Sequence, residues 1–275
     1  MGKQITNLSG YRFVLLADRP LETWRAELKE KCKSLELKGT IILSPEGINL
    51  MVSGKNEAAS QFKDLINSFD DLRGIELKES QSTYIPFTKM LVKLKPRLIP
   101  IDGPQPESVP QNTISGEELD QWYASGKSFT IVDTRNSYET RLGKFKNAVD
   151  PGISKFKEFP EYFENTFPKD RDEPVVTYCT GGIRCEKLLP YLRSKGYSNV
   201  YQLDGGILTY FEKTKGQNWE GECFVFDYRT TVDPSLEEGD VIQCFVCREP
   251  LTREEQEDHK FLLGKSCPYC FDETG

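Results

Sequence analysis

The strongest constraint on the fold is a run of short apolar segments that alternate with amphipathic ones between residues 113 and 215. FTIVD (129–133), VVTYC (175–179) and NVYQL (199–203) have the length and composition of buried strands, and segments with helical spacing separate them. This alternation predicts an α/β domain with a mainly parallel sheet covered by helices on both faces. In such sheets the functional loops follow the carboxyl ends of the strands. Cys179 lies at such an end.

Residues 1–98 predict a separate N-terminal domain. Two patterns with helical spacing, one after Pro20 and one around Phe62, are interleaved with strand signals at residues 11–17, 39–44, 47–54 and 74–80. The resulting β-α-β-β-α-β order is that of a ferredoxin-like α+β sandwich. Residues 99–112 contain four prolines and predict a semi-rigid linker to the α/β domain at 113–215. Residues 216–275 form a small, polar, cysteine-rich C-terminal segment.

A basic strip closes the N-terminal domain. YIPFTKMLVKLKPRLIP (84–100) has no acidic residue and four basic ones, Lys89, Lys93, Lys95 and Arg97. The last three recur at every second position, so an extended chain places them on one face. The strip is a candidate contact for RNA phosphates. The alternative is a solvated edge strand that lysines protect from aggregation.

The C-terminal cysteines have the spacing of a metal site. Cys244 and Cys247 precede a spacer of 19 residues that is followed by Cys267 and Cys270. This C-x2-C-x19-C-x2-C pattern lies in the range of zinc ribbons, in which four thiolates bind one tetrahedral ion. So short a segment needs a bound metal ion or another cross-link to be stable. We therefore predict structural zinc here; two disulfides or a pair of redox CxxC motifs are the alternatives.

Composition excludes several classes of protein. No apolar run approaches the length of a membrane span, and the first residues lack the apolar core of a secretory signal. With this use of cysteine, we expect a cytoplasmic location. The net charge of −7 argues against a protein that coats nucleic acid but allows a local basic patch. His259 is the one histidine, so the α/β domain cannot contain a Ser-His-Asp or Cys-His nucleophile. The sequence shows no flavin, haem or nucleotide signature.

The loop after VVTYC can activate a cysteine without histidine. Backbone N–H groups of a glycine-rich loop can surround the Cys179 sulfur, and the following helix adds its positive end. Such surroundings lower a cysteine pKa to roughly 3.5–7.5. The C-x4-R spacing is one residue shorter than the C-x5-R of cysteine phosphatases and suits a single sulfur atom better than a phosphate. A buried cysteine at a tight turn is the alternative. The predicted active-site loop comprises Thr180, Gly181, Gly182, Ile183 and Arg184.

CTGGIR (179–184) and IVDTRNSYE (131–139) together resemble a rhodanese domain. The resemblance implies that Cys179 is catalytic and that Asp133 and Arg135 form a structural acid–arginine pair at a strand end. LGKFKNAV (142–149) departs from the rhodanese pattern, which has a histidine near this position. Two further cysteines have open roles. Cys185 is either a resolving thiol for Cys179 or a packed side chain, and Cys223 is either a core thiol or a further redox residue.

The wider chain resembles the rhodanese-containing, oxygen-dependent tRNA uridine hydroxylases. SPEGIN, KFKNA, FKEFP, LDGGI, GECFVFDYR and the paired CxxC motifs follow the order of that family over nearly the whole chain. The resemblance implies hydroxylation of the wobble uridine of tRNA to 5-hydroxyuridine, with molecular oxygen as co-substrate and Cys179 as a persulfide-forming cysteine. It also implies the anticodon loop as partner, the basic strip as a tRNA contact, and a sulfur donor or reductant. The alternatives are a persulfide-carrying sulfurtransferase and a non-enzymatic RNA-binding module with a vestigial loop.

Overall fold

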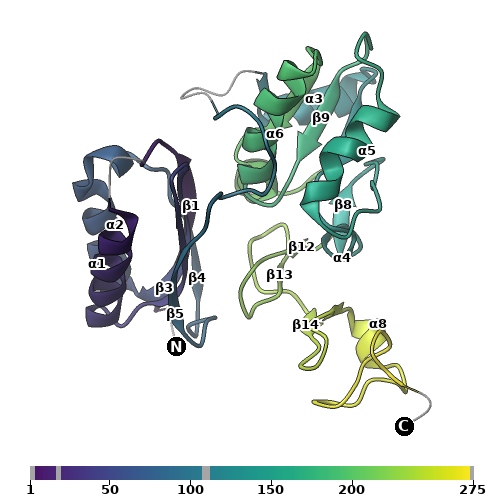
Figure 1. The fold of residues 1–275 in the computed structure, drawn as a ribbon. Coiled ribbons are helices and arrows are strands. Elements are labelled where there is room, and N and C mark those ends of the chain that lie inside the picture. The colour runs from purple at the N-terminus through teal and green to yellow at the C-terminus, as the bar shows by residue number, and fades with distance from the viewer. Residues whose placement is uncertain (1–3, 17–19, 107–111, 273–275) are drawn as a thin grey trace. The chain divides into compact units, whose positions relative to one another are not determined.

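Two separate hydrophobic cores divide the chain into two units, Met1–Pro100 and Ile101–Gly275 (Figure 1). The computed structural model describes residues 4–16, 20–106 and 112–272. None of the helices in this described part is long and apolar enough to cross a bilayer. Residues 107–111 of the predicted linker lie outside the described residues. Ile99 and Ile101, at the start of that predicted linker, are buried.

The first unit is a five-stranded sheet with two helices. Its elements are β1 (Ile5–Phe13), α1 (Leu21–Ser34), β2 (Lys38–Ser44), β3 (Gly47–Lys55), α2 (Asn56–Ser68), the 3-10 turn η1 (Asp70–Leu72), β4 (Lys78–Ser82) and β5 (Met90–Leu94). The strand order is β4-β1-β3-β2-β5, and only the β2–β5 pair is parallel. The expected β-α-β-β-α-β order is therefore present. The strand β5 is added at the edge beside β2.

The first strand lies earlier in the chain than expected. The prediction at 11–17 followed the apolar run VLL, but β1 spans Ile5–Phe13 and ends where Phe13 pairs with Gly47. Leu15 is exposed, so part of that run is not core. The sequence of the first half of β1 has a polar pattern because Asn7 and Ser9 lie on the sheet face opposite the one that carries Leu8.

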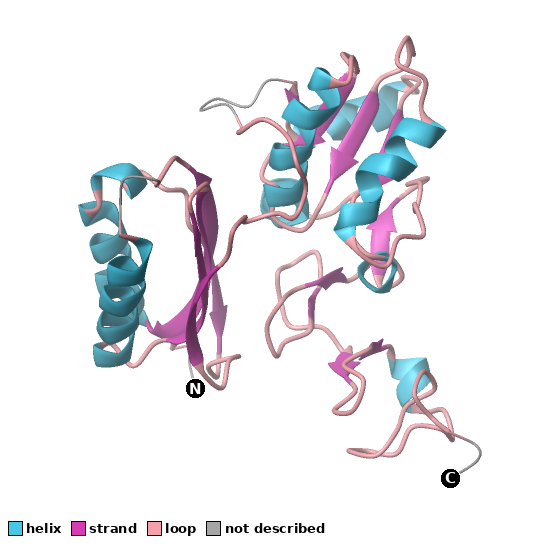
Figure 2. Cartoon of the chain, in the orientation of Figure 1, coloured by secondary structure: helices cyan, strands magenta, loops and turns pink. Residues whose placement is uncertain are grey.

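One face of this sheet is covered by α1 and α2 (Figures 1 and 2). Trp24, Leu28 and Cys32 of α1 are buried at helical spacing. With Phe62 and Ile66 of α2 they pack against alternate residues of the central strands: Leu8, Ile41, Leu43, Ile48, Leu50 and Val52. Because strand side chains alternate between faces, the residues between these core positions form the second face of the sheet.

The second unit contains the parallel sheet. Its elements are β6 (Thr113–Ile114), α3 (Gly116–Ser125), β7 (Thr130–Asp133), α4 (Ser137–Thr140), β8 (Gly143–Phe145), η2 (Phe156–Glu158), α5 (Phe159–Thr166), β9 (Val175–Tyr178), α6 (Ile183–Ser194), β10 (Val200–Leu203) and α7 (Gly206–Thr214). The strand order is β6-β10-β9-β7, and each pair is parallel. The predicted α/β fold with helices on both sheet faces is confirmed.

Local signals explain the helix boundaries. Ser115 caps α3 by accepting a hydrogen bond from the Glu118 amide at 3.1 Å. Gly126 ends the same helix in the left-handed conformation, with φ 68°. The short helix α4 has a capping box formed by Asn136 and Glu139. These caps fix the elements that lead into and out of the candidate site.

The remaining residues form short strands and one short helix: β11 (Trp219–Gly221), β12 (Cys223–Phe224), β13 (Thr231–Val232), β14 (Ile242–Gln243), β15 (Pro250–Leu251) and α8 (Arg253–Gln256). The strand β11 pairs with β8, and Trp219, Cys223 and Val225 belong to the core of the parallel-sheet domain. The first part of the predicted C-terminal segment is thus built into that domain. The domain boundary at 215 stays a prediction.

Candidate active site and metal centre

The loop after β9 wraps its backbone around the Cys179 sulfur. The Gly182 amide donates a hydrogen bond to Cys179 Sγ at 3.1 Å. The amides of Arg184 and Cys185 at the start of α6 also hydrogen-bond to this sulfur. Gly182 has φ 96°, a conformation that side chains other than glycine rarely adopt. The Cys179 side chain is 1% exposed, so the sulfur is held inside the cup that these amides form.

The start of α7 sets the direction in which the loop amides point. The Ile207 amide donates to the Cys179 carbonyl at 3.0 Å, and the Leu208 amide donates to the Thr180 carbonyl at 3.1 Å. Because these carbonyls are bound on the α7 side, the N–H groups of the loop are free to converge on the sulfur. A Cβ at Gly206 would lie 2.5 Å from the Cys179 carbonyl oxygen. Glycine is therefore required where α7 meets the loop.

These contacts favour the Cys179 thiolate. Burial alone raises the pKa of Cys179, but the hydrogen bond from the Cys185 thiol, the charge of Arg184 and the backbone amides outweigh burial and lower this pKa to about 5. Burial and the neighbouring thiolate raise the pKa of Cys185 well above its usual range. Cys179 is thus the anion of the pair, and Cys185 is the proton donor.

Arg184 is bound by Glu139 of α4. Its guanidinium donates to Glu139 Oε2 at 2.8 Å and to Oε1 at 2.7 Å, and both side chains are buried. The carboxylate also accepts from the Asn136 amide at 3.1 Å. Burial alone lowers the pKa of Arg184, but the Glu139 carboxylate raises this pKa by a larger amount, so the guanidinium stays charged. Sequence reasoning missed Glu139. The Asn136-x-x-Glu139 capping pattern marks its helix but not its partner.

Asp133 and Arg135 form a second buried pair at the end of β7. Arg135 donates from Nε and from an Nη to both Asp133 oxygens, at 2.7–3.1 Å, and both side chains are 0% exposed. Arg135 also donates to the Gly143 carbonyl of β8 at 2.6 Å. The pair joins β7 to β8, which fits a structural role in the domain.

The other two cysteines of this domain are buried near the loop. The Cys185 sulfur lies 3.6 Å from Thr134 Oγ1 and hydrogen-bonds to Cys179. Cys223 lies in the core, and burial raises its pKa to about 12. The surroundings of Cys223 are those of a core thiol, whereas the position of Cys185 is compatible with packing and with a resolving role.

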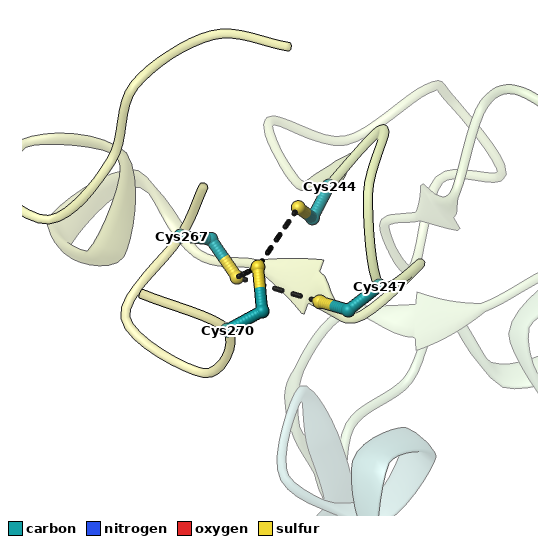
Figure 3. Close-up of side chains that lie close together, drawn as sticks. All are labelled: Cys244, Cys247, Cys267 and Cys270. Carbon is teal, nitrogen blue, oxygen red and sulfur yellow. Dashed lines mark hydrogen bonds between the residues drawn. The ribbon is translucent and has the colours of Figure 1, made fainter. Parts of the chain in front are cut away.

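The four C-terminal cysteines lie together (Figure 3). Their sulfur atoms are all within 4.8 Å of one another, and three of the separations are 3.5, 3.6 and 3.9 Å: Cys247–Cys267, Cys267–Cys270 and Cys244–Cys270. A tetrahedron with zinc–sulfur bonds of about 2.3 Å has sulfur–sulfur edges of about 3.8 Å. The four thiols therefore form a cluster that fits one tetrahedral metal ion.

Comparison with known proteins identifies the family. Residues 5–98 match the model described as a UPF0176 acylphosphatase-like domain, and residues 115–213 match the rhodanese-like domain. A tRNA uridine(34) hydroxylase of Cupriavidus metallidurans is 41% identical over 98% of this chain and 97% of its own length. The corresponding protein of Paraburkholderia xenovorans is 41% identical over the same shares of the two chains. This chain belongs to the tRNA uridine(34) hydroxylase family. The resemblance inferred from the sequence motifs is confirmed.

A rhodanese-like domain protein of Staphylococcus aureus is one of the solved structures similar to this tRNA uridine(34) hydroxylase family member. Its crystal structure aligns with 29% identity over 36% of this chain and 91% of that chain, with a TM-score of 0.32.

The basic strip lies in the first unit of this family member. Lys93 is in β5, and Lys89, Lys95 and Arg97 flank that strand; all four are exposed. Met90, Val92 and Leu94 pack on the helix-covered core, so Lys93 points to the opposite face. β5 is also an edge strand of the sheet. The location is compatible with both expectations, an RNA contact and a protected edge.

Proposed function

We propose that this protein uses Cys179 to hydroxylate the wobble uridine of tRNA at C5 with molecular oxygen. Family membership over nearly the whole chain supports the substrate. The observation that carries the chemistry is the Cys179 sulfur held by backbone amides, because such a loop keeps a nucleophilic thiolate without histidine. The wobble base is unpaired in the anticodon loop, so it can reach a protein pocket at modest unstacking cost. We also propose a cytoplasmic location, which a tRNA-modifying role supports.

The proposed reaction uses the Cys179 thiolate and two equivalents of an external thiol. The Cys179 thiolate adds to C6 of uracil, which turns C4–C5 into an enolate. The enolate combines with O2 at C5 and takes up one proton, which gives a C5 hydroperoxide. Two equivalents of a thiol reductant convert the hydroperoxide into a hydroxyl group, releasing water and a disulfide. Loss of the C5 proton and of the Cys179 sulfur then restores the C5–C6 double bond and yields 5-hydroxyuridine. Loop amides can stabilise the developing oxyanion. The Arg184 guanidinium is bound to Glu139, so we assign this role to the loop amides.

A persulfide on Cys179 is the rival reactive group. The Cys179 side chain is 1% exposed, and a terminal persulfide sulfur would lie about 2 Å beyond Sγ. A protein that is one sulfur atom heavier at Cys179, with activity lost after mild reduction, would favour the persulfide. A covalent adduct with tRNA containing 5-fluorouridine would favour thiolate addition at C6.

A persulfide-carrying sulfurtransferase is the second candidate function. The observation that favours it is the match of residues 115–213 to a rhodanese-like domain. Thiosulfate turnover with cyanide as acceptor, measured beside 5-hydroxyuridine formation, separates the two functions. Hydroxylation is the better proposal because the relatives named as hydroxylases align with the N-terminal unit and the paired CxxC motifs as well.

The second face of the N-terminal sheet is proposed as the tRNA docking surface. The strand register places four lysines on this face, Lys38, Lys55, Lys78 and Lys93, and none of the residues of the five strands on this face is acidic. Glu79, the acidic residue in these strands, is on the helix side and pairs with Lys63. The same face carries Tyr11 and Phe13, whose rings are 5.9 Å apart. Lysines and aromatic rings on one face of a sheet are a recurrent RNA-binding combination.

Charge reversal tests this surface. Lys38→Glu with Lys93→Glu should weaken tRNA binding and make the salt dependence of binding shallower by about one unit per lost phosphate contact. Lys31→Glu with Lys33→Glu, at two exposed positions of α1, makes the same change in net charge and is the matched control. Equal effects of the two double variants would show that only net charge matters.

We also propose that a structural zinc ion is bound by the cluster of Cys244, Cys247, Cys267 and Cys270. The metal would hold the segment together, and its four thiolate ligands would leave no open position for substrate.

The direct test of the proposed function is a reaction with purified protein, unmodified tRNA, labelled oxygen gas and a thiol. The label should enter C5 of the wobble uridine with the wild-type protein and not with Cys179→Ser. Label-free 5-hydroxyuridine, or no product with any thiol or persulfide donor, would contradict the proposal.

A further inference from the structure

Two exposed aromatic residues stand on a hairpin beside the catalytic loop. Phe226 is 46% exposed and Tyr228 is 49% exposed. Their neighbours on both sides are buried, including Val225 and Thr230. Single exposed aromatic residues are common on protein surfaces. These two lie at alternate positions between buried flanks, on a hairpin that contacts the loop holding Cys179.

The hairpin is attached directly to the loop that holds Cys179. β12 and β13 pair through Cys223 with Val232 and Phe224 with Thr231. Thr180, the residue after Cys179, has its hydroxyl 3.5 Å from the Phe224 carbonyl oxygen and donates to it. Cys223 is also hydrogen-bonded to Thr180. The aromatic tip therefore begins two residues beyond a contact with the catalytic loop.

The tip is held in one shape by its own polar groups. Arg229 donates from Nε and from an Nη to the two Asp227 oxygens, at 2.9 and 2.6 Å. The Val225 amide donates to the Thr230 carbonyl at 2.8 Å. The Phe226 ring meets the Phe224 ring edge to face, with centroids 5.1 Å apart. The hairpin tip and the Phe226 ring are thus pre-organised, so little conformational freedom is lost when a ligand stacks on this ring.

The charge and shape of the hairpin tip indicate which class of ligand it can bind. The Asp227 carboxylate is neutralised by Arg229, so the surface between the rings offers flat apolar area without net charge. Such a surface suits the face of a nucleobase, which stacks on aromatic rings, rather than a phosphate. A nucleobase has a flat, uncharged face and therefore matches this surface.

We infer that Phe226 and Tyr228 form an aromatic platform on which the target uracil stacks beside the Cys179 loop. The inference rests on the proposed function and assigns the residues that hold the reacting base.

Cross-linking tests the platform without catalysis. The full-length protein is mixed, with oxygen excluded, with an anticodon stem-loop that carries 5-iodouridine at the wobble position, and is then irradiated. We expect the cross-linked peptide to contain Phe226 or Tyr228. Cross-links confined to other segments would overturn the inference.

Kinetics give an independent readout. Phe226→Ala and Tyr228→Ala should each lower kcat/KM for tRNA by roughly fivefold to a hundredfold, the value of one base–aromatic stack. Phe226→Tyr and Tyr228→Phe keep a ring and should restore most of the activity. Leu263→Ala removes a side chain that is 70% exposed and should change nothing. The alkylation rate of Cys179, measured in every variant, separates loss of the platform from disruption of the loop.

Three outcomes are decisive. Unchanged kcat/KM in both alanine variants would overturn the platform while the hydroxylation by wild type still stands. A change in oligomeric state in these variants, with unchanged kcat/KM, would assign the rings to self-association and would also overturn it. Absence of hydroxylation by the wild type would contradict the proposed function, which the cross-link does not measure.

Discussion

Arg184 of the loop after β9 and Glu139 of α4 form a buried ion pair with two parallel hydrogen bonds. Two residues after Glu139, Arg141 donates to Glu255 at 2.7 Å, to Glu249 at 3.2 Å and to the Pro250 carbonyl, all of the cysteine-rich segment. The helix α4 thus contacts the loop that holds Cys179 through Glu139. The residue that follows α4, Arg141, contacts the cysteine-rich segment. Both contacts depend on the position of one short helix.

Glu139→Gln should destabilise the protein strongly. The change leaves the buried Arg184 guanidinium without its counter-ion, and breaking a buried pair from one side costs about 3–5 kcal/mol. Urea unfolding measures the free energy of unfolding. Glu161→Gln, on the exposed side of α5, is the control and should change it by less than about 0.5 kcal/mol. Equal values for the two variants would mean that the Arg184–Glu139 pair does not hold the loop.

Gly206→Ala should disrupt the loop, and Gly181→Ala should not. A Cβ at Gly206 would overlap the backbone of Cys179 and Gly182, whereas a Cβ at Gly181 meets no atom within 4 Å. We expect Gly206→Ala to slow alkylation of Cys179 at neutral pH, because displaced amides no longer stabilise the thiolate. Gly181→Ala should keep the wild-type alkylation rate and stability. A wild-type rate in Gly206→Ala would refute the role given to α7.

The stability of the wild type relative to Cys179→Ser should depend on pH. The pKa of Cys179 is lowered to about 5 in the folded protein, whereas an unfolded cysteine has a pKa of about 8.5. Between these values the unfolded chain binds more protons, so the free energy of unfolding rises with pH, by up to about 1.4 kcal/mol per unit. The contribution is complete above about pH 8.5 and is lost as the pH falls through about 5. A difference between the two proteins that stays constant over this range would place the thiol pKa near its ordinary value.

Removal of the metal should loosen the C-terminal segment before the rest of the chain. The purified protein should contain one zinc ion per chain, and Cys267→Ser should lose it. Hydrogen exchange should then speed up around β14, β15 and α8, while β7, β9 and β10 stay protected, because these strands belong to a separate core. A metal-free protein with unchanged exchange in the segment would argue against a structural metal.

Local sequence patterns predicted most of the architecture. Period-2 and helical spacing located the central strands and the longer helices of both units but not β6 or β8, and placed the strand at 74–80 a few residues before β4 (Lys78–Ser82). The CxxC spacing located the cysteine cluster. The strand β1 was misplaced because Leu15 extends an apolar run beyond the sheet, while Asn7 and Ser9 lie on its second face. Apolar periodicity detects only the face that is packed against helices.

Long-range pairing was not visible in the sequence. Glu139 and Arg184 are 45 positions apart, and no local spacing connects them. Gly206 was quoted within LDGGI, but its need for glycine arises from the backbone of Cys179, which lies on a different strand end. Phe226 and Tyr228 enter the sequence analysis only within the GECFVFDYR motif, and only the structure shows that they are exposed.

The most direct test of the whole account is nucleoside analysis of tRNA from cells in which the sole copy of this protein is either wild type or Cys179→Ser. We predict 5-hydroxyuridine or its derivatives at the wobble position with the wild type and their loss with Cys179→Ser at equal protein levels. The same amount of modified uridine in both strains would contradict the assignment of Cys179 as the catalytic residue.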